Sequence, residues 1–374
     1  MRSGKYTPQL KDNARYQAFV PSLLPFTLKS DPVLEDLLSR ANLALGRLDG
    51  IAEVVPDVNF FILMYVRKEA TLSSQVEGTQ ATFADVLKAE ARVEDIEIHK
   101  DVDEILNYID AMNHGLERLK SFPLSLRLIR EIHKKLLRGV RGEHKTPGEF
   151  RRSQNWVGGP TIETASYLPP PHHELDLLLD NFEKFMHDNS PMPVLIKIGL
   201  LHSQFENIHP FLDGNGRIGR LLNTFYLCQQ GALKKPLLYL SQFFKANRRE
   251  YYDKLNAVYE HDDIEGWLKF FLTGVAQTAN SAVTTARKIV ALRERDLARV
   301  GSFGRSAERG LKLLQFLYKT PMVRISDIEN ATKLENPNAL TLARKFVTAK
   351  ILKEITGRRR NRVYAYREYI DLFD

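Results

Sequence analysis

Apolar residues recur at helical spacing over most of the first 300 positions. The clearest case begins at Asp31-Pro32, a capping residue followed by a proline suited to the first helical position. An apolar stripe follows it: Leu34, Leu37, Leu38, Ala41, Leu45 and Leu48. Similar patterns predict helices at 58–77, 101–119, 126–138, 173–188, 194–207 and about 265–299. We therefore expect a mainly α-helical protein, with nearly everything up to residue 300 in helices.

One long segment, 142–172, interrupts this pattern. It is rich in glycine and proline, which break helices, including Gly158-Gly159-Pro160 and the three prolines at 169–171. Short extended stretches around Val157 and around Tyr167-Leu168 could pair as a hairpin. Long non-helical insertions of this kind are more often functional than not, so we expect this segment to serve the site.

The last 70 residues have a different pattern. After a plausible linker at 301–304, a capping box at Ser326–Glu329 opens a short helix, and a second helix is expected at about 339–349. Two β-like stretches follow at 352–356 and 363–366. This order is typical of a winged helix-turn-helix. The sequence thus predicts an N-terminal region (1–100), a core (101–300) and a C-terminal domain (301–374).

Composition and charge narrow the class of protein. An apolar fraction of 43% and a charged fraction of 27% are those of an ordinary globular protein. The single cysteine, Cys228, excludes an intramolecular disulfide and lies in an apolar run, so we expect it to be a buried hydrophobe. We find no signal peptide and no apolar stretch of ~18 residues, which predicts a cytoplasmic protein outside the membrane.

The positive charge is concentrated at the C-terminus. Of a net charge of +8, residues 305–374 contribute most, with 15 Lys/Arg against 8 Asp/Glu. A basic module on a nearly neutral body predicts an acidic partner. Both DNA and an acidic protein surface remain open as that partner.

The residues with the clearest chemistry lie at 209–220, His-Pro-Phe-Leu-Asp-Gly-Asn-Gly-Arg-Ile-Gly-Arg. An apolar helix ends before His209, Pro210 prevents its continuation, and another helix begins near Arg217. A glycine-rich turn at a helix N-terminus offers free N–H groups to phosphate. Arg217 and Arg220 share one helix face and could bind further phosphate oxygens.

Two more groups complete this cluster. A carboxylate beside phosphates, here Asp213, is the usual protein ligand for Mg²⁺. A histidine such as His209 titrates near neutral pH and can accept a hydroxyl proton. Together these groups predict nucleotidyl or phosphoryl transfer.

The twelve residues match the motif of the Fic family, His-Pro-Phe-x-(Asp/Glu)-Gly-Asn-Gly-Arg-x-x-Arg, at every defined position. The resemblance extends over most of residues 15–300. It implies a Fic-type helical bundle with a β-hairpin flap, and transfer of AMP from ATP to Ser, Thr or Tyr hydroxyls of proteins with release of pyrophosphate. Related death-on-curing kinases have Ala-Asn-Lys where this chain has Gly-Asn-Gly, which favours adenylyl transfer.

The resemblance also implies residue roles. His209 would be the general base, Phe211 would anchor the loop in the core, and Asp213 would bind Mg²⁺. Tyr251 resembles a family residue that contacts the base or ribose. The other implied nucleotide contacts are Glu77, Gly214, Asn215, Gly216, Arg217, Ile218, Gly219 and Arg220.

A second motif precedes the core. Ser73-x-x-x-Glu77-Gly78 resembles the Fic inhibitory motif, and its serine and glutamate share one helix face. The resemblance implies that Glu77 pairs with Arg220 and withholds that arginine from the γ-phosphate. ATP would then bind with its α-phosphate misaligned for attack. An inhibitory motif before the core implies a class II, intramolecularly inhibited member.

Partners follow from the same resemblance. The insertion at 142–172 resembles the Fic flap, which pairs with an extended target segment by strand addition. We expect protein substrates, including the chain itself, and a homodimer. Two alternatives remain. One is a DNA-binding regulator that uses the Fic domain as a nucleotide sensor. The other is a de-AMPylase or phosphocholine transferase on the same fold.

Overall fold

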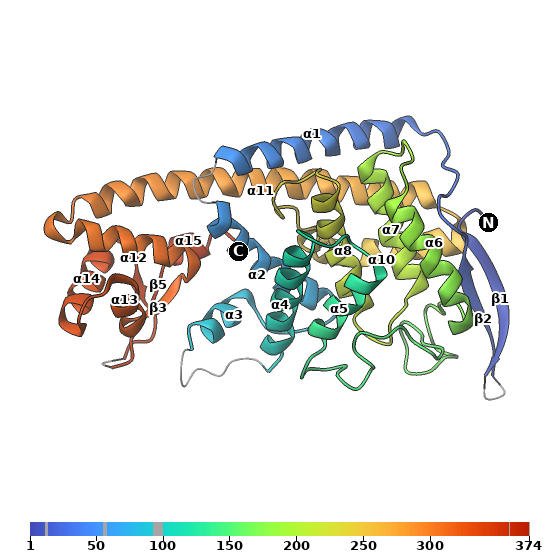
Figure 1. Cartoon of the computed structure of the whole chain (residues 1–374), viewed down its shortest axis with the longest axis horizontal. Helices are drawn as coiled ribbons and strands as arrows, with labels where there is room; N and C mark the ends of the chain where they lie inside the picture. Colours follow the sequence, from blue (N-terminus) through green and yellow to red (C-terminus); the bar gives the residue numbers. More distant parts are fainter. Residues whose placement is uncertain (12–13, 55–57, 93–99, 359, 374) are drawn as a thin grey trace.

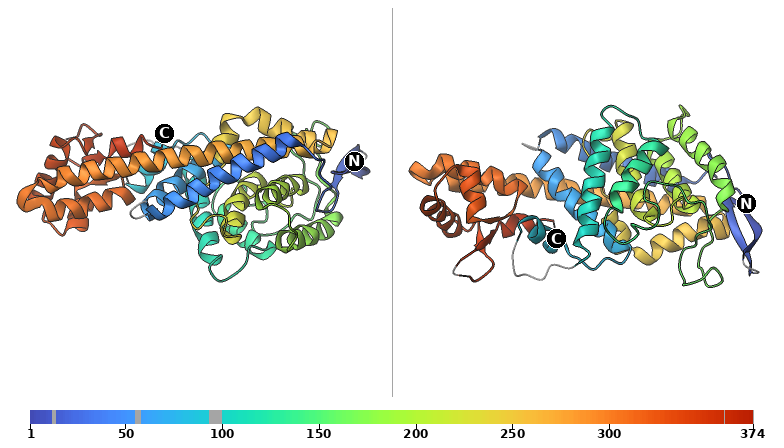
Figure 2. Two further views of the ribbon diagram at one scale, coloured as in Figure 1. Left: turned by 90° about the horizontal axis from the view of Figure 1, so that it is seen from above. Right: turned by 60° about the horizontal axis from the view of Figure 1, so that its bottom comes forward.

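Two long helices run side by side, and the longer of them continues into the C-terminal part of the molecule (Figure 1 and Figure 2). They are α1 (Pro32–Val54) and α11 (Ile264–Gly301). The structure is a computed structural model that describes residues 1–11, 14–54, 58–92, 100–358 and 360–373. With 38 residues, α11 is about 57 Å long. It therefore spans from a large helical body at one end to a small C-terminal module at the other.

The helical body surrounds two buried helices, α7 (Val194–Ile208) and α8 (Asn215–Gln229). Its other helices are α2 (Val58–Val76), α3 (Phe83–Glu90), α4 (Val102–Arg118), α5 (Leu126–Leu136), η1 (His172–Glu174), α6 (Leu175–His187), α9 (Ser241–Ala246) and α10 (Arg248–His261). Even Lys197 and His202 of α7 are buried, because helices pack on every side of it. The expectation of a mainly helical protein is confirmed.

The first 21 residues are not helical, and here the expectation was wrong. Strands β1 (Gly4–Lys11) and β2 (Ala14–Pro21) form an antiparallel hairpin, with Gly4 opposite Pro21. The side chain of Arg2 holds its base through ion pairs with Asp262 and Glu265. The side chains of Ala18 and Phe19 are fully buried, so the hairpin gains its stability from the body on which it packs.

The C-terminal module alternates helices with a small sheet. Its elements are η2 (Gly304–Ser306), α12 (Ala307–Lys319), β3 (Met322–Arg324), α13 (Ile325–Thr332), α14 (Asn336–Thr348), β4 (Lys353–Glu354), β5 (Val363–Ala365) and α15 (Arg367–Ile370). The strands lie in the order β3-β5-β4, all antiparallel. The sequence predicted the last two strands and missed β3.

The predicted capping box at Ser326–Glu329 is wrong. Helix α13 begins one residue before Ser326, and the carboxylate of Asp327 accepts the N–H of Arg324 at 2.7 Å. Glu329 instead accepts from the side-chain amide of Asn336 at 2.6 Å. The acidic residue at 327 therefore takes the role that the pattern gave to 329.

The end of the chain packs back onto the body. The hydroxyl of Tyr366 donates to the buried Asp296 of α11, and Arg295 pairs with Glu368. The ring of Phe373 contacts Tyr65 of α2, with centroids 5.3 Å apart. The C-terminal module is thus attached to α2 as well as to α11.

Two expectations from composition can be compared with the structure. Within the described ranges, no helix combines the length and hydropathy needed to cross a lipid bilayer. Cys228 is half-buried, and burial raises the pKa of its thiol to about 12. The thiol is therefore protonated and unreactive at neutral pH.

Candidate active site

His209 lies immediately after the last residue of α7, in a left-handed backbone conformation (φ 49°, ψ 58°). Its Nδ1 lies 3.2 Å from the carbonyl oxygen of Glu206. Because a carbonyl only accepts, Nδ1 carries the proton and Nε2 keeps a free lone pair. Burial lowers the pKa of His209 to about 4. The imidazole is therefore neutral at pH 7 and able to accept a proton.

The loop after His209 is fixed by its own side chains and by the flap. Phe211 is fully buried and stacks on His133, with ring centroids 3.8 Å apart, as the loop anchor should. The side-chain amide of Asn215 bonds both the N–H and the carbonyl of Phe211 at 2.8 Å. Arg151 donates to the carbonyl of His209 at 3.0 Å. The loop is therefore preorganised before any ligand binds.

Helix α8 begins directly after this loop. Gly214 adopts φ 78°, a left-handed conformation that favours glycine, and the helix starts at Asn215. The first backbone N–H groups of a helix lack intrahelical acceptors and attract anions. The predicted glycine-rich cradle is thus located at a helix N-terminus.

Arg217 lies in the first turn of α8 between two carboxylates. Its Nη2 is 3.4 Å from Oδ1 of Asp213, and its Nη1 is 3.6 Å from Oε2 of Glu104. The side chain is only 1% exposed, yet Nε and Nη1 have no hydrogen-bond partner among the described residues. Buried N–H groups are normally paired. These two therefore suit a phosphate oxygen as their acceptor.

Arg220 contacts the end of α2, where the Ser73–Gly78 motif lies. It donates to Oγ and to the carbonyl of Ser73, at 2.8 and 3.0 Å, and to Oε1 of Glu77 at 2.6 Å. Gly78 follows with φ 98°. Burial raises the pKa of Glu77, but the charge of Arg220 outweighs this and leaves it below the usual value. Glu77 is therefore ionised and paired with the arginine that the sequence predicted.

Two glycines of α8 make room for carboxylates. A Cβ at Gly216 would overlap Oε1 of Glu77, and a Cβ at Gly219 would overlap Oε1 of Glu206. The Glu77 carboxylate therefore reaches the first turn of α8, where an anionic ligand would also lie. These contacts give Gly216 and Gly219 a steric role in the present conformation.

The flap pairs as the sequence suggested, through a single bridge. The N–H of Val157 donates to the carbonyl of Tyr167 at 2.9 Å. The hydroxyl of Tyr167 donates to the carbonyl of Asn207, just before His209, at 2.6 Å. On its other side, the carbonyl of Leu168 accepts from Phe19 of β2 at 2.9 Å. The flap is thus held between the end of α7 and the N-terminal hairpin.

Comparison with known proteins identifies this arrangement. A model of the Fic/DOC family N-terminal region matches residues 35–117, and the Fic/DOC family model matches residues 123–227, which include the loop and cradle just described. The chain belongs to the Fic/DOC family.

Sequence relatives and solved structures agree with this assignment. The chain is 33% identical over 172 residues to "Protein adenylyltransferase Fic" of Aedes aegypti, which covers 45% of this chain and 30% of the relative. It is 32% identical over 206 residues to the protein of the same name from Drosophila grimshawi, which covers 52% of this chain and 38% of the relative. The match thus spans about a third of the length of these relatives.

Two crystal structures share the fold. A Fic family protein from Desulfovibrio desulfuricans has a TM-score of 0.58 at 18% identity, and covers 90% of this chain and 97% of its own. A Fic domain containing signaling protein from Bacteroides thetaiotaomicron has a TM-score of 0.52 at 19% identity, and covers 69% and 97%. At these identities the likeness extends to the fold alone.

Tyr251, one of the predicted nucleotide contacts, lies in the core of the fold. It is 1% exposed, its hydroxyl lies 3.0 Å from Nε2 of His202, and its ring stacks on Phe244. A side chain so enclosed belongs to the core behind Arg220. Its neighbour Tyr252 is only half-buried. A nucleotide contact by Tyr251 therefore stays a prediction.

Sequence reasoning missed several polar residues of the Fic site. Arg151 and Asn155 hold the backbone of His209, and Glu104 faces Arg217. Glu206 lies beside Gly219 with Oε1 enclosed and unpartnered among the described residues. Burial raises the pKa of Glu206 to about 8, so it is protonated at pH 7. Its position three residues before His209 was the only available signal.

The donor set at Asp213 suits Mg²⁺ in combination with phosphate. Its Oδ1 accepts the N–H of Gly214 at 2.6 Å, and its side chain is 31% exposed. In the part of the chain that the structure describes, no three His, Cys, Asp or Glu side chains gather to hold a metal alone. Mg²⁺ commonly takes one or two carboxylates plus substrate phosphates, so a single exposed carboxylate fits.

Proposed function

We propose that the protein is an adenylyltransferase that moves AMP from ATP to Ser, Thr or Tyr hydroxyls of proteins, including itself. One observation carries the proposal. The free Nε2 of neutral His209, the N-terminus of α8 and the buried guanidinium of Arg217, whose Nε has no partner among the described residues, belong to one loop–helix unit. The name of the relatives, protein adenylyltransferase, supports the choice of AMP over phosphate.

The chemistry follows from these groups. The target hydroxyl gives its proton to Nε2 of His209, and its oxygen bonds to the α-phosphorus. The bond from that phosphorus to the bridging oxygen breaks, and pyrophosphate leaves. Arg217 and the first N–H groups of α8 stabilise the charge that develops on the phosphate oxygens. Asp213 would hold Mg²⁺, which neutralises phosphate charge when bound.

We further propose that Glu77 inhibits this reaction. Its carboxylate occupies Arg220 and the first turn of α8, which are the groups that would orient the terminal phosphates of ATP. Productive transfer depends on in-line geometry, so losing these contacts lowers the rate. Removal of Glu77 should therefore activate the enzyme.

Incubation with Mg²⁺ and ATP labelled at the α-phosphate tests both proposals. We expect weak labelling of wild-type protein, strong labelling of Glu77→Gly, and none of Glu77→Gly/His209→Ala. The matched control is Glu90→Gly, which also removes a glutamate that pairs with an arginine, here Arg67. This variant should label like wild type. Transfer by Glu77→Gly from γ-labelled ATP or CDP-choline, with none from α-labelled ATP, would contradict adenylyl transfer.

We also propose that residues 301–374 form a winged helix-turn-helix domain after the N-terminal region (1–100) and core (101–300). The order α12, β3, α13, α14, β4, β5 and the three-stranded sheet support this division. Helices α13 and α14 are separated by only three residues, as in a helix-turn-helix.

Sedimentation of the purified chain would test the expected homodimer.

A further inference from the structure

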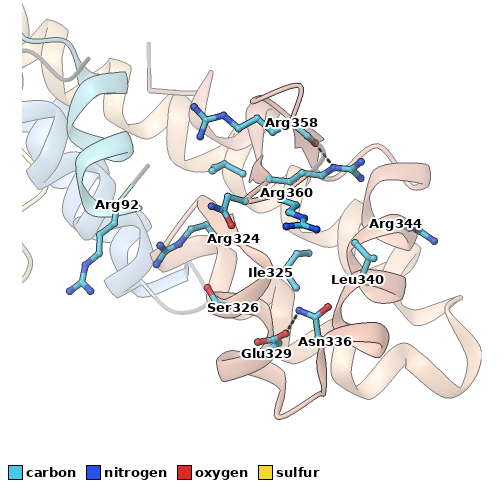
Figure 3. A pocket seen from close by; sticks show the side chains of 13 residues that line it. Arg92, Arg324, Ile325, Ser326, Glu329, Asn336, Leu340, Arg344, Arg358 and Arg360 are labelled. Atoms are coloured by element: carbon cyan, nitrogen blue, oxygen red, sulfur yellow. Dashed lines mark hydrogen bonds between the residues drawn. The ribbon is translucent and has the colours of Figure 1, made fainter. Parts of the chain in front are cut away.

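The C-terminal module contains a hollow of 560 Å³ lined largely by arginine. It lies between the start of α13, one face of α14 and the loop from β4 to β5 (Figure 3). We call this hollow the arginine groove. Its arginines are Arg92, Arg324, Arg344, Arg358, Arg360 and Arg362. All but Arg92, which follows α3, belong to the module.

Part of the positive charge of the arginine groove is not paired with any described carboxylate. Its single acidic lining residue, Glu329, accepts a hydrogen bond from Asn336. Arg344 and Arg360 are exposed and make no ion pair with any described residue. Arg324 is partly compensated, because its Nε lies 3.5 Å from Oδ2 of Asp327. Nearby like charges repel, so an anion in the groove would lower the free energy of the module.

Other acidic residues of the module are engaged elsewhere. Glu308 pairs with Lys312, Glu368 pairs with Arg295, and Glu354 accepts from the backbone of Gly357. The charge is thus available to a ligand from outside the chain.

The lining indicates which anion fits. Guanidinium forks bind phosphate oxygens with two parallel hydrogen bonds. The apolar lining is aliphatic, namely Ile325, Leu340 and Val363, with no aromatic ring. A free nucleotide or an unpaired strand is usually held by stacking its bases on aromatic side chains. The groove therefore suits phosphodiesters whose bases are already paired.

Helix α14 gives the groove a surface that suits duplex DNA. Asn336, Leu340 and Arg344 are spaced four apart on it, so one helix face lines the groove. The major groove of B-form DNA admits an α-helix, whereas that of an RNA duplex is too narrow. Arg360 of the β4–β5 loop points into the groove opposite this face, where it can reach the flanking backbone (Figure 3).

We propose that the arginine groove binds the phosphate backbone of duplex DNA. The inference stands on the C-terminal module alone, so it holds whether or not the chain transfers AMP.

Fluorescence anisotropy of a labelled duplex of roughly 20 base pairs tests the proposal with the full-length chain over a salt series. The test variant is Arg344→Gln/Arg360→Gln, which removes two exposed charges without breaking an ion pair among described residues. The matched control is Arg47→Gln/Arg287→Gln, two exposed arginines of α1 and α11 that lie outside the groove and make no ion pair with any described residue.

We expect the test variant to bind DNA at least about tenfold more weakly than wild type. The slope of log K against log salt concentration should become less steep by about 2, since each lost phosphate contact removes about 0.9. The control should stay within twofold of wild type. Equal losses in both variants would overturn the proposal. So would tighter binding of an RNA duplex, of single-stranded DNA, or of poly-glutamate at equal charge, the last of which would indicate an acidic protein partner.

Discussion

Nη2 of Arg220 donates a 2.6 Å hydrogen bond to Oε1 of Glu77, although the two residues are 143 positions apart. The arginine is 1% exposed and also holds Ser73, so the last turn of α2 is fixed against the first turns of α8. Breaking a buried pair by removing one partner leaves an uncompensated charge. A phosphate would restore the balance, which makes ligand binding and release of Glu77 energetically linked.

Gly216→Ala should destabilise the protein through Glu77. Its new Cβ would overlap Oε1 of Glu77, and overpacking of this kind costs about 1–3 kcal/mol of unfolding free energy. In a Glu77→Gly background this overlap is absent and only a tight approach of 3.1 Å to Nη1 of Arg220 remains, so the same substitution should cost far less. Urea unfolding of the four proteins measures this coupling. Gly46→Ala, whose Cβ would meet nothing within 4 Å, is the control. Equal costs in both backgrounds would show that the carboxylate does not lie there.

The rate of AMP transfer should be insensitive to pH near neutrality. With the pKa of His209 held at about 4 by burial, the base form dominates at pH 7. Glu77→Gly should therefore show a level rate from pH 8 down to about 5.5, and a fall only as pH approaches the pKa of His209. Removing Glu77 takes away a negative charge that raises this pKa, so the break moves no higher. Circular dichroism at each pH checks folding, and a break near pH 6.5 would contradict a buried base.

Glu206→Gln should become increasingly stabilising relative to wild type as pH rises from 5 to 8. Burial raises the pKa of Glu206 to about 8, so between about 4.5 and 8 the folded protein keeps a proton that the unfolded chain has released. Wild-type stability therefore falls with rising pH by up to about 1.4 kcal/mol per unit from this group, and glutamine removes the effect. Urea unfolding at each pH measures the difference, with the exposed Glu117→Gln as control. A difference that does not vary with pH would mean that Glu206 is ionised in the folded state.

Asp213→Asn should lower the affinity of the protein for Mg²⁺ while leaving the loop intact. Asparagine keeps an oxygen for the N–H of Gly214 but loses the charge. Losing an outer-shell partner of a metal costs about 10–100-fold in affinity, so loss of this ligand charge should raise the half-maximal Mg²⁺ concentration by at least about tenfold. The assay is AMP transfer by Glu77→Gly proteins. Glu104→Gln, which removes the other carboxylate beside Arg217, should not shift the Mg²⁺ dependence.

The sequence predicted the elements whose signal is local. The stripe after Asp31-Pro32 lies on α1, and the helix–loop–helix around His209 lies where glycine and proline required it. The hairpin at 4–21 was missed because its strands are stabilised by contacts that local pattern does not contain, such as Arg2 with Glu265 and Phe19 with Leu168. Strand β3 was missed for a similar reason, since only three residues pair with β5.

The site was predicted as far as a motif extends. The contact between Glu77 and Arg220 follows from two motifs distant in sequence, and the fold contains it. The residues that hold those motif residues, such as Arg151 and Asn155, carry no signal in a single sequence, because their role is to donate to backbone carbonyls. The burial of Tyr251 likewise depends on packing against Phe244 and His202, which spacing alone does not specify.

Helix α2 connects two distant parts of the molecule. Tyr65 in the middle of α2 contacts Phe373 of the C-terminal module, and Glu77 follows the last residue of α2, about 18 Å farther along the helix axis. A helix slides or turns as one stiff piece. Any axial shift that withdraws the Glu77 carboxylate from Arg220 must also move the Tyr65 ring against Phe373. The packing of Phe373 and the position of the Glu77 carboxylate beside α8 are therefore coupled through the position of α2.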